Sequence, residues 1–447
     1  MTALSDLTQR LLDEARKAGA DASDAIAVDG TSVSIDVRGG ALENADRSEG
    51  IDVGLRVLIG NRQACVSSSD TKPETLRTMA ERAVAMARIA PEDPYAGLAD
   101  PSQLATNTAT EDLELYDATP EPDPAALQDD AARAEAEALK NPGISQVQQS
   151  SAGYSHRRIH LSASNGFDAG YARTDRGISC LAITGTGTAM ERDYDYDSRI
   201  FQADLRDAAE IGRIAAERAV ARAGATRPKT GAYPVMFDER IASSLIGHLL
   251  QAVSGGAIAR GSSWLLGALG EQVLPKGLSV IEDPHRVRTS GSKLFDAEGL
   301  PTTRRAIVDD GVLTGWTLDL ATGRKLDMAS TANASRGTTA PPSPSLTNVA
   351  LTQGTQTQAE MLRDMGTGLL VTSMIGSTIN PNTGDYSRGA SGFWVENGEI
   401  THPVNEITVA GNLRDMLMRI TPANDARTHL SRVVPSLLVE GLTLAGD

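Results

Sequence analysis

Two of the six histidines in this 447-residue chain stand at a spacing that could bind zinc. His156 and His160 form an HxxxH pair, which on a helix would place both imidazoles on one face. Their segment, HRRIHLSA, alternates polar and apolar residues, and this pattern predicts a strand. Four residues along a strand span about 13 Å, whereas zinc lies about 2 Å from each ligand. We therefore expect both histidines on the solvated face of a strand, without a shared metal.

The other histidines and a run of aspartates give no better metal site. His248 falls on a predicted helix over residues 238–254, beside its apolar stripe, so we expect it to pack in or next to the core. Three more histidines are isolated in loop-like or strand-edge segments: His285, His402 and His429. The segment ERDYDYDS resembles a run of calcium ligands, but it lacks the glycine and the terminal glutamate of an EF-hand loop. Its aspartates are expected on a solvated strand face or hairpin end: Asp193, Asp195 and Asp197.

Nucleophilic and phosphate-binding motifs are equally incomplete. SxxK occurs at Ser69 to Lys72 and at Ser290 to Lys293, but Ser69 precedes a proline and the second match follows the KTG segment at 229–231. That order does not suit serine acyl-enzyme chemistry. The sequence contains no GxxxxGK[ST] or GxGxxG motif that would bind a nucleotide.

Composition narrows the possible partners. Fifty-eight acidic against 42 basic residues give a formal charge of −16, which repels nucleic acid and anionic membranes. Cys65 and Cys180 are far apart and form no CxxC pair, as a reducing compartment allows. The first twenty residues mix charge into an amphipathic pattern without an unbroken apolar run. We expect a cytoplasmic protein that binds neither nucleic acid nor membrane.

The elements that must position any site suggest an α+β fold in three parts. Two small helix/strand domains, at 1–110 and 111–226, are followed by a β-rich C-terminal domain at 227–447. The boundary near residue 110 rests on the proline-rich stretch 90–123, which suits a linker better than a core. Similar segments, AERAVAMAR at 80–88 and AERAVARAG at 216–224, leave open whether one unit was duplicated.

Three long C-terminal segments resemble the TldD/PmbA family, and specifically its PmbA (TldE) branch. They are IGHLLQAVSGGAIARGSSW at 246–264, NTGDYSRGASGFWVENGEITHPVNEITVAGNLRDML at 382–417 and PSLLVEGLTLAG at 435–446. DRSEGIDVGLRV at 46–57 is similar to the family's first domain, so the resemblance covers nearly the whole chain.

This resemblance implies a three-domain subunit of a cytoplasmic zinc metallopeptidase. In the family, a TldD-type subunit holds the metal with an HExxxH helix and a C-terminal cysteine, and a PmbA-type subunit pairs with it around a cavity for unstructured peptides. Alignment without gaps sets the HExxxH residues against Ile246, Gly247 and Gln251, and the last segment of this chain contains no cysteine. The resemblance therefore implies that zinc belongs to the partner subunit, and that this chain has no catalytic residue or cofactor of its own.

Polar residues on Gly-rich loops are the remaining candidates for contact with a peptide. They are Arg260, Ser262, Asn380, Asn382, Tyr386 and Arg388, for each of which a turn or interface role is an alternative. The main hypothesis is a metal-free partner of a TldD-type HExxxH subunit, expected to be inactive alone. The alternative is a non-enzymatic, homodimeric peptide-binding protein or a modulator of another enzyme, such as DNA gyrase.

Overall fold

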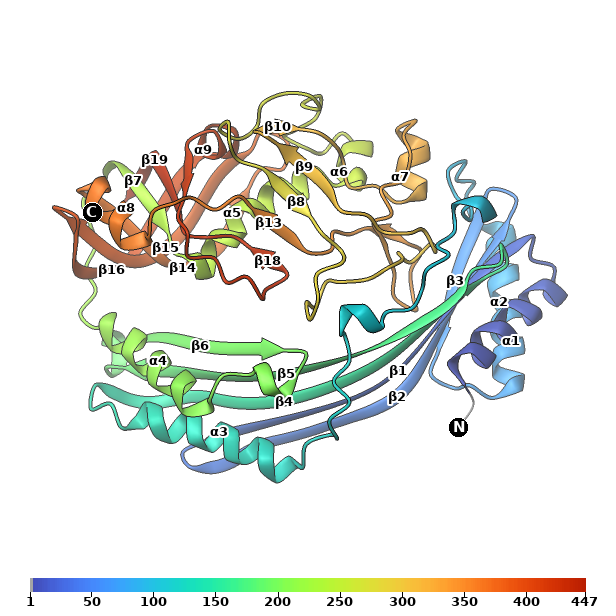
Figure 1. The fold of residues 1–447 in the computed structure, drawn as a ribbon, viewed down its shortest axis with the longest axis horizontal. Coiled ribbons are helices and arrows are strands. Elements are labelled where there is room, and N and C mark those ends of the chain that lie inside the picture. Colours follow the sequence, from blue (N-terminus) through green and yellow to red (C-terminus); the bar gives the residue numbers. More distant parts are fainter. Residues whose placement is uncertain (1–2) are drawn as a thin grey trace.

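The computed structural model describes residues 3–447, with the side chains at positions 377 and 378 left aside. Its N-terminal half contains two units with the same order of elements: helix, three strands, helix (Figure 1). The first unit consists of α1 (Leu4–Ala18), β1 (Ala22–Arg38), β2 (Ala41–Ile59), β3 (Arg62–Ser68) and α2 (Pro73–Ile89). The second consists of α3 (Pro124–Leu139), β4 (Ile144–Ala163), β5 (Asp168–Thr184), β6 (Glu191–Arg199) and α4 (Ala208–Ala221). Duplication of one unit would produce this shared order.

The six strands of the two units form one antiparallel sheet, in the order β3-β2-β1-β4-β5-β6. β1 and β4 join the units, pairing from Asp24 opposite Ala163 to Val37 opposite Ser150. The sheet is long and curved, with α1 and α2 near one end and α3 and α4 near the other (Figure 1). The two helix/strand units therefore share a continuous sheet.

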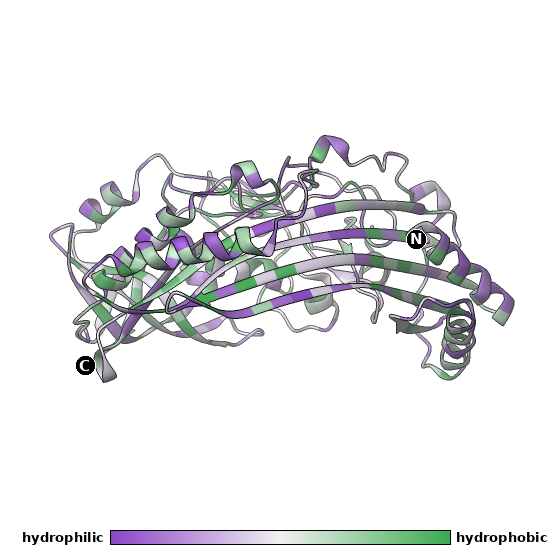
Figure 2. Ribbon diagram, turned by 90° about the horizontal axis from the view of Figure 1, so that it is seen from below, coloured by the Kyte–Doolittle hydropathy of each residue, from purple (hydrophilic) through white to green (hydrophobic). Residues whose placement is uncertain are grey.

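Successive side chains of a strand point to opposite faces of the sheet. Figure 2 shows apolar and polar residues alternating along the strands. On β1, Ala25 and Ala27 pack in the core with α1 and α2. Val33 and Ile35 pack in the core with α3 and α4. Ile26 faces the other way and packs in a cluster with Phe295 of the C-terminal part. One face of the sheet thus carries all four helices, and the other carries the C-terminal part.

The close approach of α3 and α4 depends on a glycine. A Cβ at Gly212 of α4 would lie 1.9 Å from the carbonyl oxygen of Ala134 in α3. Gly212→Ala should therefore push the helices apart and lower the free energy of unfolding by about 1–3 kcal/mol. Gly247→Ala is the matched control within a helix, because a Cβ there would meet no atom within 4 Å.

The control should leave stability unchanged or raise it by up to about 1 kcal/mol, since alanine favours helix over glycine. Urea denaturation of both variants checks this pair of expectations. Equal stabilities for the two variants would show that the packing of α3 on α4 does not require a glycine.

The proline-rich connection 90–123 lacks long regular elements but is held against both parts of the molecule. Ala105 donates its N–H to Gly299 O at 2.8 Å, and the Arg288 N–H reaches Leu113 O at 2.9 Å. Thr174 of β5 donates to Leu115 O at 3.1 Å. Leu113 and Leu115 are buried. The stretch is therefore a packed strap between the sheet and the C-terminal part.

The C-terminal part contains two larger sheets and a two-stranded ribbon. The first sheet has the order β16-β15-β14-β7-β19-β17, and β16 also pairs with β19. Its strands are β7 (Gly231–Phe237), β14 (Gly368–Ile379), β15 (Asp385–Glu396), β16 (Glu399–Asn412), β17 (Ile420–Pro422) and β19 (Leu437–Ala445). The second is β10-β9-β8-β13-β18, with β8 (Val280–Glu282), β9 (Arg305–Asp309), β10 (Val312–Leu313), β13 (Val349–Leu351) and β18 (Arg432–Val433). The ribbon pairs β11 (Ala334–Ser335) with β12 (Ser343–Pro344).

Five helices complete the C-terminal part. They are α5 (Glu239–Ala252), α6 (Gly255–Ala259), α7 (Leu320–Lys325), α8 (Gln358–Met365) and α9 (Leu413–Leu417). A single large apolar core joins α5 to strands of both larger sheets. Across residues 3–447, none of the helices that the structure describes has the length and apolar character needed to span a membrane.

Three charged residues fasten the C-terminal part to the sheet, and we call them the Asp24 latch: Asp24 on β1, Arg56 on β2 and Arg336 after β11. Asp24 accepts Arg56 Nε–H at 2.6 Å and forms an ion pair with Arg336. All three side chains are buried. The backbone of Thr338 lies so close to β2 that a Cβ at Gly54 would be 2.3 Å from its carbonyl oxygen.

A carboxyl beside the latch should make stability depend on pH. Glu298 lines the same small pocket as Asp24 and Arg56, and burial, together with Asp296, raises its pKa to about 8. The unfolded chain releases this proton near pH 4.3, so between about pH 4.3 and 8 the native state binds more protons than the unfolded state. Stability should therefore fall as pH rises through this window.

Glu298→Gln should flatten that fall, because glutamine carries no proton to lose. Some slope should remain, since burial also raises the pKa of Asp296. Urea denaturation from pH 5 to pH 8 gives both profiles. Parallel profiles for the two proteins would rule out Glu298 as the source of the slope.

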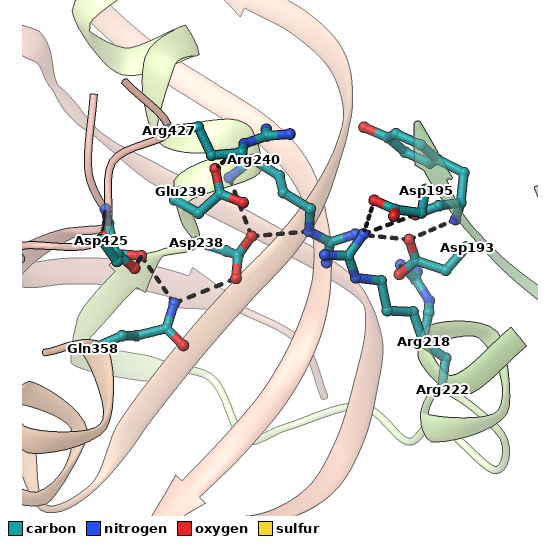
Figure 3. A network of polar contacts seen from close by, with 12 residues as sticks. Asp193, Asp195, Arg218, Arg222, Asp238, Glu239, Arg240, Gln358, Asp425 and Arg427 are labelled. Carbon is teal, nitrogen blue, oxygen red and sulfur yellow. Dashed lines mark hydrogen bonds and ion pairs between the residues drawn. The ribbon is translucent and has the colours of Figure 1, made fainter. Parts of the chain in front are cut away.

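The prediction that Asp193, Asp195 and Asp197 lie on a solvated face is wrong, because all three are buried on β6. Figure 3 shows arginines around Asp193 and Asp195. Asp195 accepts from Arg206 and Arg218 at 2.7 Å each, and Asp193 accepts from Arg240 of α5 at 2.9 Å. Arg199 of β6 pairs with Asp197, but the arginines that pair with Asp193 and Asp195 lie outside this strand, which is why the alternation alone suggested solvent.

Candidate functional site

Helix α5 carries the positions that the family resemblance singled out. Asp238 caps its N-terminus by accepting the Arg240 N–H at 3.1 Å, so the predicted helix is confirmed. One face is anchored in the core by Ala242, Leu245, Ile246 and Leu249. Near the C-terminal end, another face borders a pocket.

This pocket, here called the α5 pocket, has a volume of about 520 Å³. It lies between α5, the turn after α6 and the turn that joins β14 to β15. Its lining residues are His248, Gln251, Ala252, Ser254, Ala257, Arg260, Ser262, Trp264, Ile379 and Pro381. Such a volume suits a small ligand or a short piece of peptide, and the wall mixes apolar surface with uncharged polar groups and one guanidinium.

Two of the six predicted peptide-binding residues line the α5 pocket. The exposed guanidinium of Arg260 makes no hydrogen bond or ion pair with any side chain or carbonyl that the structure describes. Ser262 donates its backbone N–H to Ala257 O at 2.9 Å, which fixes the turn, while its hydroxyl has no partner in the same described set. Both side chains are therefore free to bind a ligand.

Asn380 and Asn382 flank Pro381 in the turn between β14 and β15. The side-chain oxygen of Asn380 accepts the Asn382 N–H at 3.0 Å, and Asn380 O accepts the Gly384 N–H at 2.9 Å. Gly384 has a φ of +81°, which suits glycine. Asn380 thus shapes the turn, whereas Asn382 is exposed and does not line the pocket.

Tyr386 and Arg388 lie on β15 and do not line the pocket. Tyr386 is buried, its hydroxyl donates to Met374 Sδ at 3.4 Å, and burial raises its pKa to about 12. Its ring packs against that of His248, with centroids 5.9 Å apart. Arg388 donates Nε–H to Gly376 O at 2.8 Å. Tyr386 therefore supports His248, which lines the pocket, whereas Arg388 contacts the backbone of β14.

His248 is the lining residue that sequence reasoning assigned to packing alone. It is half-buried, and its Nε2 atom is buried with no hydrogen-bond partner in the described part of the chain. Burial, with the nearby charge of Arg388, lowers its pKa to about 4. The imidazole is therefore neutral at pH 7. Its Nδ1 atom, which has no hydrogen-bond partner among the described residues, can form one hydrogen bond with a ligand. Its place on the pocket face, three residues before Gln251, was the available signal.

The residues at the family's metal-binding positions do not fit zinc. Ile246 is 1% exposed and belongs to the core, so position 246 faces away from the pocket. Gly247 has no side chain, and Gln251, which lines the pocket, offers only an amide. Within the described residues, no three His, Cys, Asp or Glu side chains gather closely enough to hold a metal ion.

The two histidines of HxxxH lie on β4 with different neighbours. His156 packs against Tyr116, with centroids 5.3 Å apart. His160 is half-buried and not solvated as predicted, because its Nδ1 atom lies 3.2 Å from the hydroxyl of Thr8 in α1. Ser162 joins this cluster by donating to Asp168 at 2.5 Å. Thr8 and Ser162 are buried, so neither hydroxyl can reach a substrate.

The fold and the α5 pocket together define a three-part α+β protein with a peptide-sized pocket and no metal-ligand set on its central helix. Family models match the chain in three consecutive segments: PmbA/TldA metallopeptidase domain 1 at residues 23–87, the central domain at 117–223 and the C-terminal domain at 230–446. The chain therefore belongs to the PmbA/TldD family, in its PmbA branch.

Individual relatives agree along the whole length. The chain is 36% identical to "Metalloprotease PmbA" of Escherichia coli O157:H7 over 93% of this chain and 90% of that protein. It is 37% identical to a "Metalloprotease PmbA homolog" of Haemophilus influenzae, over 97% and 94% of the two chains. A crystal structure from Bacteroides thetaiotaomicron, described as a putative modulator of DNA gyrase, superposes with a TM-score of 0.92 at 28% identity, covering 99% and 98% of the chains.

Proposed function

We propose that this chain is the metal-free, peptide-binding subunit of a cytoplasmic zinc metallopeptidase. A TldD-type partner would hold zinc on its HExxxH helix, and the two subunits would enclose a cavity that admits unstructured peptides. The chain supplies the wall of that cavity and groups that bind the peptide backbone. Proteolysis would require both subunits.

One observation carries the proposal: α5 has a core-facing Ile246 and an amide at Gln251 where a metal-binding helix needs ligands, yet it still borders an open pocket. The free groups there suit a peptide. Arg260 and Ser262 are hydrogen-bond donors without protein partners in the described structure, and the neutral His248 can accept from or donate to an amide. The family names of the relatives support the metallopeptidase class.

Co-expression with an HExxxH-bearing relative tests the assembly. We expect a stable complex, zinc in the partner only, and cleavage of unstructured peptides by the complex but not by either chain alone. One tightly bound zinc in the purified chain, together with peptidase activity, would contradict the proposal. If the chain forms a homodimer that binds peptides and forms no complex with the HExxxH-bearing relative, it is instead a non-enzymatic binding protein.

Arg260→Gln tests the pocket within that complex. A charge-assisted hydrogen bond contributes about 1.5–3 kcal/mol, so we expect binding of a labelled unstructured peptide to weaken by about tenfold or more. Stability should not change, because Arg260 is exposed and holds no other described residue. Arg10→Gln is the matched control, because it removes an exposed arginine of α1 that also has no partner among residues 3–447. Fluorescence anisotropy measures both, and equal affinities would remove Arg260 from the site.

A further inference from the structure

A second pocket lies at the other end of α5, where that helix and the segment 427–434 face β5 and β6 of the sheet. Its volume is about 280 Å³. Cationic side chains outnumber carboxylates on its wall. The cations are Arg199, Arg240, Arg288, Arg427 and Arg432, and the carboxylates are Asp175 and Glu239. His429 also lines the pocket, but burial lowers its pKa.

Two of these arginines keep donors free. Arg199 binds Asp197 through Nε–H alone, at 3.0 Å, and Arg427 binds Glu239 through Nε–H alone, at 2.7 Å. The terminal nitrogens of both guanidinium groups have no hydrogen bond to any atom in the described structure. The carboxylates thus hold each side chain in place while the outer edge of its planar fork remains available.

Hydroxyl groups surround these free donors. Four serines line the pocket, and none of their hydroxyls has a hydrogen-bond partner among the described residues: Ser198, Ser243, Ser290 and Ser431. A third arginine also carries an unused donor, since Arg432 Nη1 is buried without a partner in that same set. Spare guanidinium and hydroxyl donors in one cavity are the groups that recognise an oxyanion.

We propose that this pocket binds a compact oxyanion, either the C-terminal carboxylate of a peptide or inorganic phosphate. Its size admits a terminal group with one or two residues and excludes a folded partner. It is separate from the α5 pocket, because Ser243 and Gln251 are eight residues apart, about 12 Å along the helix axis. The carboxylate source rests on the proposed function, whereas the phosphate source does not.

Calorimetric titration of the isolated full chain separates the two sources without a partner or zinc. The probes are acetyl-tetra-alanine with a free C-terminus, its C-terminal amide, and inorganic phosphate. Binding of the free acid at least about tenfold tighter than the amide identifies a carboxylate. Binding of phosphate alone identifies phosphate. No heat of binding from any probe up to about 10 mM overturns the proposal.

Variants tie the binding to this pocket. Arg427→Gln should weaken the bound probe by about tenfold or more, since it removes a charged donor. Ser290→Asp should do the same by placing a carboxylate on the pocket wall, and Ser290→Asn is its neutral control. Ser290 is exposed and unpartnered within the described chain, so this pair decides the question even if Arg427→Gln fails to fold. Affinity that neither Arg427→Gln nor Ser290→Asp changes overturns the assignment.

Discussion

Asp24→Asn is expected to lower the free energy of unfolding by about 3–5 kcal/mol. The substitution keeps the shape of the side chain but leaves Arg56 and Arg336 buried without their shared carboxylate. Arg336 has the most to lose, because its side chain is fully buried and burial already lowers its pKa to about 10. Removing one partner of a buried ion pair costs more than the pair itself contributes.

Urea denaturation at pH 7 measures the loss, and Glu43→Gln provides the control. Glu43 pairs with Arg38 at 3.3 Å on the exposed edge of the same sheet, where ion pairs contribute less than about 1 kcal/mol. A loss below 1 kcal/mol for Asp24→Asn would mean that water reaches the Asp24 latch.

Asp193→Asn should produce the second large loss, about 3 kcal/mol. Burial alone would lower the pKa of Arg240, but Asp193 and Asp238 together raise it. The loss should sit at the low end of the range for buried pairs, because Asp238 remains 2.9 Å from Arg240 and Glu191 remains 3.6 Å from Arg222.

Because Arg240 lies in the first turn of α5, the variant should also loosen that turn from β6. Hydrogen exchange of α5 amides and urea denaturation report the two effects. Glu217→Gln, which breaks the exposed pair with Arg213 on α4, should change neither. If the hydrogen-exchange rates of the α5 amides do not change, the apolar core alone holds the helix in place.

Local patterns predicted the elements well where each element carries its own signal. Leu7, Leu11, Leu12 and Ala15 gave α1 its buried face, and Gly19, with a φ of +96°, ends the helix as expected. Pro73 opens α2, and Asp238 caps α5. These signals lie within a few residues of what they control, so one sequence suffices to read them.

Features that depend on distant partners could not be read in this way. Asp193 looked solvated because its arginines lie up to 47 residues away. The packed strap looked like a linker because its prolines forbid regular structure, although its backbone finds partners in the C-terminal part.

The candidate site shows the same division. The resemblance located α5 and its Gly-rich loops, and two of the six predicted residues, Arg260 and Ser262, line the α5 pocket. His248 was expected only to pack, because the turn at Pro381, which forms the opposite wall of its pocket, lies more than a hundred residues away in the chain. No local pattern could show that the two would enclose a pocket. The second pocket, proposed to bind an oxyanion, is lined by five separate segments of the chain, so no local sequence pattern predicted it.

The sheet shared by the two helix/strand units has a consequence for how the chain folds. β1 supplies side chains to both helical cores, yet its pairing with β4 joins residues as far apart as Asp24 and Ala163. A nascent chain must therefore wait for β4 before the open edge of β1 is covered. Such long-range pairing is slow, because the chain must lose the conformational entropy of a large loop before any stabilising contact between the strands forms. The N-terminal half should fold as one late, cooperative event, and its most vulnerable period is the interval in which β1 has been synthesised and β4 has not.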